Sequence, residues 1–241
     1  MRARILFLDV GNTLVRERTS RHELYAACAR AHGLDVDAAR ARAAMVAAHR
    51  ALPLVVDGAY RYGDAWFRSF IERVFCVDFG LPRGELAAVQ DELFATFEDP
   101  ATFELAAGAR ELVAALHARG LRTGIVSNWS ARLPRLLDRL GFGACFEPLV
   151  CSALVGFEKP DPRIFALALE RANVGAGEAL HAGDDERNDS AAAHSGIHAI
   201  LVGPPNGSAQ PSTPRSGGPR GAPVARVDDL NALRAYILAL R

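Results

Sequence analysis

The chain has 241 residues, half of them hydrophobic, and its 28 basic residues balance 28 acidic ones to a formal net charge of zero. That length and composition suit one large domain or a core with a smaller insert, built around a well-packed interior. The balanced charge lacks the basic field of a nucleic-acid binder and the polybasic cluster of a membrane-surface protein, so neither partner is expected.

Apolar runs such as 5–8 have the length of a strand and fall far short of the roughly 20 residues of a membrane span. The N-terminus enters a predicted strand at once and lacks the long apolar stretch and cleavage site of a signal peptide. The four cysteines are scattered without a CxxC pair, which favours reduced thiols. These features predict a cytoplasmic protein.

The first part of the chain predicts one strand and then a helical insert. Residues 4–9 form a buried strand that ends in Asp9. Helices are predicted for 20–33, 38–52, 65–75 and 83–97, with a capping box at Ser20 and Glu23 and a stop at Gly33. No convincing strand interrupts them, so 15–100 is expected to be all-helical. Six aromatic residues predict the insert's own core rather than a substrate wall: Tyr60, Tyr62, Trp66, Phe67, Phe70 and Phe75.

After residue 100 strands and helices alternate. Strands are predicted at 123–127, 148–152, 179–183 and 198–202, and helices at 108–119, 132–140, 162–172, 189–195 and 227–240. Such alternation with short loops predicts an α/β core of residues 1–14 and 101–241, with a parallel sheet covered on both faces. Residues 203–224 are rich in Gly, Pro and Ser and predict a flexible loop.

Polar residues gather where the predicted strands end. Asp9 ends the first strand, Ser127 and Asn128 end the second, and Asp184 and Asp189 follow the fourth, while a loop after the third carries a lysine. Ligands of such sheets bind beyond the carboxyl ends of the strands. This order of residues at successive strand ends predicts one composite site.

Lys159 is the only lysine among the 28 basic residues. An arginine-rich sequence keeps a lysine most readily where a compact charge on a flexible stem is needed. The prolines at 160 and 162 predict a stiff, exposed turn that holds the ammonium group in place. The alternative is a lysine that survived by chance on a surface loop.

The chemistry available to this set is specific. Asp9 can act as a carboxylate nucleophile and form a covalent aspartyl intermediate. With Asp184 and Asp189 it supplies hard oxygen ligands for one Mg²⁺ ion, which stabilises charge during phosphoryl transfer. Ser127 can donate to phosphate oxygens, and Lys159 offsets the remaining negative charge.

Loop N–H groups near Asn12 and Asn128 are further candidates for binding phosphate. Three structural alternatives remain open. Ser127 can be an ordinary helix cap. Asp185 can lie in a solvated turn or join the metal site. His181 stands inside a strand, where a packing role is favoured over catalysis.

In these residues the chain resembles the haloacid dehalogenase-like (HAD) hydrolase superfamily. Motif one corresponds to residues 9–13, motif two to Ser127, motif three to Lys159, and motif four to Gly183 and Asp184 with Asp189. The resemblance implies a three-layer Rossmann-like core, an inserted helical cap of the C1 type, a Mg²⁺ cofactor and hydrolysis through an aspartyl intermediate. It adds Asn12, Thr13 and Asn128 to the phosphate contacts.

Several details resemble the branch of haloacid dehalogenase-like hydrolase domain-containing 3 proteins. These details are Ala31-His32-Gly33-Leu34, Ser127-Asn128 followed by Arg132-Leu133, the run from Lys159 to Phe165, and His181-x-Gly183-Asp184.

The departure from the superfamily lies in motif one. Phosphatases of the superfamily usually carry a second Asp that protonates the leaving alcohol, and Gly11 stands at that position. The carbonyl of Gly11 can still be a metal ligand, but the general acid is missing, which typically costs about 10²–10⁴-fold in rate. Either a cap residue supplies the proton, with Asp57, Asp64 or His49 as candidates, or the substrate has a good leaving group such as an acyl phosphate, or the protein is a weak catalyst that binds its ligand.

The prediction is therefore a Mg²⁺-dependent phosphatase that acts on a small phosphorylated metabolite. Two alternatives stay open. One is a catalytically weak binding or regulatory protein. The other is a carbon–halogen hydrolase, because dehalogenases of the superfamily also lack the second Asp, although they typically lack the Gly-Asp metal motif as well. An apolar face of the cap can mediate a homodimer.

Overall fold

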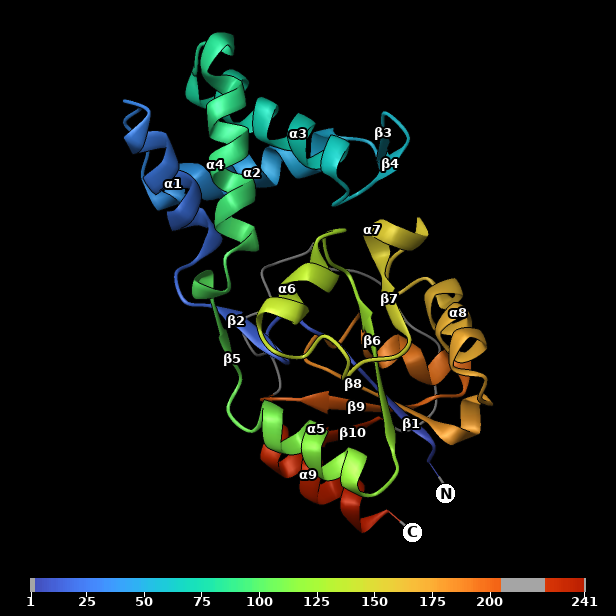
Figure 1. Ribbon diagram of the computed structural model, residues 1–241. Helices are drawn as coiled ribbons and strands as arrows, with labels where there is room; N and C mark the ends of the chain where they lie inside the picture. The colour runs from blue at the N-terminus through green and yellow to red at the C-terminus, as the bar shows by residue number, and fades with distance from the viewer. Residues whose placement is uncertain (1–2, 205–223, 241) are drawn as a thin grey trace. The chain divides into compact units, whose positions relative to one another are not determined.

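The computed structural model describes residues 3–204 and 224–240 (Figure 1). Most of the predicted loop at 203–224 lies outside the described residues. Within them, a membrane-spanning helix is ruled out by length and polarity. The chain divides into two compact units, which we call the core unit (Met1–Arg16, Leu105–Trp129 and Phe142–Arg241) and the cap unit (Glu17–Glu104 and Ser130–Gly141).

The core unit is built around a six-stranded parallel sheet with the strand order β10-β9-β8-β1-β6-β7. In chain order these strands are β1 Ile5–Leu8, β6 Arg122–Ser127, β7 Leu149–Cys151, β8 Ala179–Gly183, β9 His198–Val202 and β10 Ala225–Val227. The register places Phe7 opposite Gly124 on one side and His181 on the other. The predicted α/β class with a parallel sheet is confirmed.

Helices pack against this sheet. In chain order they are α5 Ala109–Ala118, α7 Ser152–Val155, α8 Pro162–Ala172 and α9 Leu230–Ala239. The alternate residues Ile5 and Phe7 pack with Ile164 and Phe165 of α8 in one hydrophobic cluster, which is the period-two pattern of a strand. Helices α5 and α9 lie side by side (Figure 1). Strands and helices thus form a layered core.

The C-terminal part of the core differs from the prediction. Val227 was expected to begin the last helix, but it ends strand β10, where it is paired with Val202 of β9. Helix α9 begins only at Leu230, because the Asp229 side chain accepts the Ala232 N–H and so caps the start of the helix. The helix predicted for 189–195 is a 3₁₀ helix over Ser190–Ser195. Two short strands that were missed, β2 Val15–Glu17 and β5 Phe103–Leu105, pair with each other.

The cap unit is mainly helical. Its helices are α1 Arg21–Ala31, α2 Ala38–Ala51, α3 Asp64–Glu72, α4 Leu86–Glu98 and α6 Leu133–Arg139. Ser20 caps α1 as predicted, and Gly33 takes the left-handed conformation (φ 75°) after its end. The α6 segment, which the sequence analysis placed in the core, belongs to the cap unit by its contacts.

Five of the six aromatic residues predicted for the core of the cap belong to it, whereas Tyr60, in strand β4, lies outside this cluster. Trp66, Phe70 and Phe75 are buried, and Tyr62 and Phe67 pack against them. Helix α2 adds a stripe with the spacing of one helical face, consisting of Ala41, Ala44, Met45 and Ala48.

The cap is not all-helical, which corrects the sequence analysis. Strands β3 Val55–Val56 and β4 Ala59–Tyr60 form an antiparallel hairpin, and Arg73–Phe79 continues α3 as a π-helical segment. Asp57 (φ 47°) and Gly58 (φ 75°) make the hairpin turn with two positive φ angles. An Asp-Gly pair between two strands is the usual sequence signal for such a turn. Each strand of the hairpin has only two residues, which is too short for a period-two pattern to stand out beside the longer helical pattern.

Candidate active site

The parallel sheet brings the predicted site residues together at the carboxyl ends of its strands. Strand β1 lies between β6 and β8, and Asp9, Ser127 and Asp184 stand at the carboxyl ends of these three neighbours. Because parallel strands end on the same side, residues more than 100 positions apart become neighbours. All lie in the core unit.

Lys159 lies at the centre of the site. Its Nζ donates to Asp9 Oδ1 at 2.8 Å and to Asp189 Oδ1 at 2.5 Å. The residue is only 3% exposed, whereas Pro160 and Pro162 of the turn are exposed as predicted. The turn does place the backbone at the surface at Pro160, but the flexible side chain reaches inward to the two carboxylates.

Asn128 fixes the position of Lys159. Its side-chain amide donates to the Lys159 carbonyl at 2.9 Å and accepts the Lys159 N–H at 2.7 Å. Both ends of the Asn128 side chain are therefore engaged in holding the lysine backbone. Asn128 was expected to contact phosphate, and only its backbone can serve that role without breaking this pair.

Asp189 accepts hydrogen bonds on both carboxylate oxygens. Oδ1 accepts from Lys159 and from His181 Nε2 (2.8 Å), and Oδ2 accepts the Asp185 N–H (2.9 Å). A Cβ atom on Gly183 would lie 2.2 Å from this carboxyl group, so only glycine permits the approach. Burial alone would raise the pKa of Asp189, but Lys159 and His181 outweigh it and hold the pKa well below its usual range.

The other two carboxylates, Asp184 and Asp9, have raised pKa values. Burial, then Asp9 and Asp189, raise the pKa of Asp184 to about 7. Burial also raises the pKa of Asp9, although Lys159 opposes the shift. Burial disfavours the charge on Lys159, but Asp189 and Asp9 outweigh it and raise its pKa. Lys159 forms ion pairs with Asp9 and Asp189, so one ammonium group cannot neutralise the site when all three carboxylates are ionised.

The arrangement fits a divalent cation. Carboxylate oxygens of Asp9, Asp184 and Asp189 lie within 4.8 Å of one another. Oxygen ligands and excess negative charge are what Mg²⁺ requires. Asp185 stands apart from this group, because its Oδ1 accepts the N–H groups of Arg187 and Asn188 (2.9 and 2.8 Å). Asp185 therefore shapes the turn, in line with the structural alternative.

The remaining predicted residues line the same edge. Thr13 Oγ1 donates to Asp184 Oδ1 at 3.3 Å. Ser127 Oγ is buried without a partner that meets hydrogen-bond geometry, yet it lies close enough to Asp9 to help lower that carboxyl's pKa. The Asn12 N–H donates to the Val15 carbonyl at 2.8 Å, so it is already engaged within the loop. Ser127 is thus the hydroxyl left for a ligand.

Trp129 explains the space beside Gly11. A Cβ atom built on Gly11 would lie 3.0 Å from Cζ3 of the Trp129 ring. The indole therefore fills the space that a larger side chain at position 11 would need. Sequence reasoning missed this residue, because nothing in a lone tryptophan after a strand shows where its ring will lie.

The contact of His181 with the site was also not predicted. The residue is fully buried and its ring packs edge-on against Phe165 (centroid distance 5.4 Å), which agrees with the predicted packing role. Its hydrogen bond to Asp189 gives it a second task, because it helps to orient a carboxylate of the site. The eight-residue separation from Asp189 gave no signal of this pairing.

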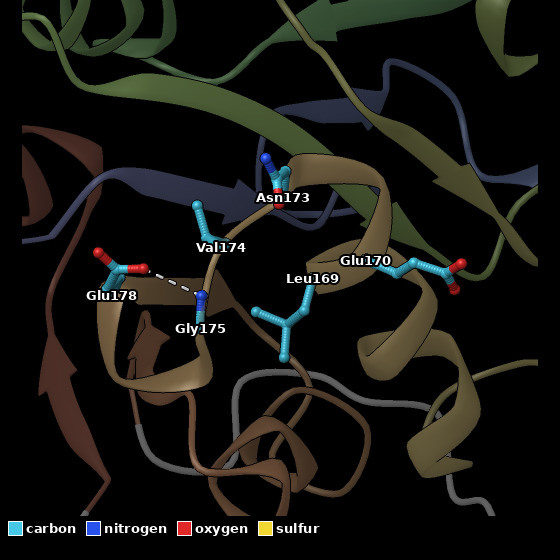
Figure 2. Close-up of a pocket in the computed structure, with 6 residues that line it drawn as sticks. All are labelled: Leu169, Glu170, Asn173, Val174, Gly175 and Glu178. Atoms are coloured by element: carbon cyan, nitrogen blue, oxygen red, sulfur yellow. Dashed lines mark hydrogen bonds between the residues drawn. The ribbon is translucent and has the colours of Figure 1, made fainter.

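A surface hollow of about 420 Å³ lies in another part of the core unit. The residues that line it come from the end of α8 and from the turn that follows it, and Figure 2 shows their side chains. Glu178 accepts the Gly175 N–H there at 3.0 Å and directly precedes β8. The hollow therefore lies at the amino end of a strand whose carboxyl end carries Asp184, away from the site.

Sequence comparison agrees with the geometry. The family model of haloacid dehalogenase-like hydrolases matches residues 3–196. The chain belongs to this family. The haloacid dehalogenase-like hydrolase domain-containing protein 3 of Mus musculus is 33% identical over 84% of this hydrolase and 82% of its own length. The phosphoserine phosphatase of Thermus thermophilus is 31% identical over 57% of this chain and 56% of its own.

Solved structures show the same fold. The HAD hydrolase YfnB from Bacillus subtilis, solved with bound magnesium, aligns over the full length of both chains with a TM-score of 0.69 and 18% identity. At that identity the likeness concerns the fold alone. Family and fold together make this protein a hydrolase of the HAD superfamily.

Proposed function

We propose that this hydrolase is a cytoplasmic, Mg²⁺-dependent phosphatase that acts on a small phosphorylated metabolite through an aspartyl-phosphate intermediate on Asp9. The observation that carries the proposal is the group formed by Asp9, Asp184 and Asp189 around a buried lysine. Asp9, Asp184, Asp189 and the Gly11 carbonyl would hold the ion. Bound Mg²⁺ would offset the repulsion between the carboxylate and an anionic substrate.

In the first step an Asp9 oxygen attacks phosphorus, a new O–P bond forms, and the bond to the leaving oxygen breaks. The leaving group departs with the bonding pair. Lys159 and Ser127 hold the phosphoryl oxygens during the transfer. Water then cleaves the aspartyl-phosphate, which releases phosphate and restores the Asp9 carboxylate.

The leaving group receives no proton from position 11, since Gly11 has no side chain. Two of the cap candidates are poor acids. The hydrogen bond from Arg132 lowers the pKa of Asp64, and burial followed by Arg61 lowers that of His49. A lowered pKa leaves Asp64 ionised and His49 neutral at pH 7. We therefore favour a substrate whose leaving group needs no proton, such as an acyl phosphate.

The test is phosphate release from a panel of acyl phosphates and alkyl phosphomonoesters, with Mg²⁺ and with EDTA. We expect Mg²⁺-dependent release, acyl phosphates to be hydrolysed faster, and Asp9→Asn to abolish turnover. Asp228→Asn is the matched control, because Asp228 is an exposed aspartate of the same unit.

Two outcomes would redirect the assignment. Mg²⁺ binding without turnover on any substrate would favour the weak binding or regulatory protein. The absence of an acidic side chain at position 11 is shared with dehalogenases, so halide release that is indifferent to EDTA would favour carbon–halogen hydrolysis.

A further inference from the structure

A second group of potential ligands lies in the cap unit, separate from the acidic site of the core. Cys28 belongs to α1, His32 follows its last turn, and Glu92 belongs to α4. One ligand atom from each residue lies within 4.8 Å of the other two. The spacing of four places Cys28 and His32 on one face of α1, and Glu92 closes the group from the neighbouring helix.

The chemistry of the three side chains differs from that of the core site. His32 Nε2 lies 3.0 Å from Glu92 Oε2. The Cys28 residue is 3% exposed, whereas the side chains of His32 and Glu92 are 19% and 44% exposed. The thiol thus forms the floor of the group, and the imidazole and carboxylate form a rim through which an ion can enter.

A role as a nucleophile or a redox-active thiol does not suit Cys28. Burial, followed by Glu92, raises the pKa of the Cys28 thiol to about 12. A thiol in this state is a poor nucleophile and is slow to oxidise, because the thiolate is the reactive form. A metal ion changes this balance, since binding a thiolate displaces the proton.

We propose that Cys28, His32 and Glu92 bind a thiophilic divalent cation of the Zn²⁺ class, with water as the fourth ligand. Sulfur, nitrogen and carboxylate oxygen are the ligands of tetrahedral Zn²⁺ sites, and three protein ligands with one water is a common arrangement. A thiolate and a carboxylate together neutralise the charge of the ion. Mg²⁺ prefers oxygen alone, so the two sites of the protein select different metals.

The ion would link α1 to α4 within the cap unit. These helices otherwise meet through apolar contacts of the cap core, to which Cys28 also belongs. A ligand that binds only the folded state stabilises it. Bound metal therefore stabilises the cap without taking part in hydrolysis.

Co²⁺ is the probe for the first experiment, because a cobalt–thiolate bond gives a charge-transfer band that carboxylate ligands do not give. Full-length protein is stripped with chelator, supplied with excess Mg²⁺ to occupy the core site, and titrated with Co²⁺. We expect a band that saturates at one ion per chain and disappears when Zn²⁺ is added. Cys28→Ala should abolish it, and His32→Ala or Glu92→Gln should weaken binding roughly tenfold or more.

Cys76→Ala is the matched control, since Cys76 is another cysteine of the cap that lies outside the group. It should leave the band unchanged. No band in the wild-type protein, or a band that survives Cys28→Ala, would overturn the proposal. The rim variants His32→Ala and Glu92→Gln keep the test decisive if Cys28→Ala fails to fold, and circular dichroism of the metal-free variants checks their folding.

Discussion

Asp184→Asn should make the metal-free protein more stable at high pH while removing its response to Mg²⁺. The substitution keeps the shape of the side chain, and an amide oxygen can still accept the hydrogen bond from Thr13. It removes a charge that the fold disfavours, because burial and the neighbouring carboxylates raise the pKa of Asp184 from 3.8 to about 7.

The sign of the expected change in stability follows from the linkage between proton binding and folding. An unfolded Asp184 ionises near pH 4, whereas the folded residue holds its proton up to about pH 7. Metal-free stability therefore falls as the pH rises through this window and is lowest above it. At about 1.4 kcal/mol for each pKa unit, the full penalty is on the order of 4 kcal/mol, and partial exposure of the group reduces it. The variant lacks this penalty at every pH.

Urea unfolding at pH 4 and pH 8, with EDTA and with Mg²⁺, measures the effect. We expect the variant and the wild type to be alike at pH 4 and the variant to be more stable by roughly 2–4 kcal/mol at pH 8 in EDTA. Mg²⁺ should stabilise only the wild type. Asp228→Asn, at an exposed site, should change little. A variant less stable than the wild type at pH 8 in EDTA would show that Asp184 is held favourably as an anion, and the reasoning would be wrong.

Three further predictions concern turnover and stability. Lys159→Arg should lower phosphate release by roughly 100-fold or more, because the planar guanidinium group of arginine does not replace a compact ammonium group shared by two carboxylates. Near-normal steady-state kinetics of this variant would show that the lysine is replaceable. Gly11→Asp alone should not speed hydrolysis of alkyl phosphates, since the new side chain meets the Trp129 ring, and a faster rate in the same assay would contradict that steric argument. Asp64→Asn should leave the turnover rate within about twofold of the wild type and lower the free energy of unfolding in urea by less than about 1 kcal/mol, because it loses only an exposed ion pair with Arg132. A large fall in the rate of a well-folded variant would identify Asp64 as the missing general acid.

The sequence alone determined the class of the fold and which polar residues stand at the ends of its strands. Alternation of strands and helices depends on local periodicity, so the parallel sheet could be predicted from it. Asp9, Ser127 and Asp184 were identifiable because each ends a strand or directly follows one, and the topology of parallel sheets brings such positions together. Lys159 could be singled out because it is the only lysine in the sequence.

Elements set by few residues were harder to predict. Strand β10 has three residues, and its pairing with β9 comes from a neighbour distant in sequence. The hairpin at Asp57 and Gly58 carried a recognised turn signal, but two-residue strands leave no periodicity to support it. Short elements depend on tertiary contacts more than on local propensity.

Only the tertiary structure decided how the site residues interact. The burial of Lys159, its two carboxylate partners and the Trp129 ring beside Gly11 all depend on side-chain directions in packed surroundings. The same holds in the cap, where Glu92 joins Cys28 and His32 from another helix. Sequence spacing specifies which backbone positions share an edge or a face, whereas charge compensation and pKa values depend on distances of a few ångströms that only folding fixes.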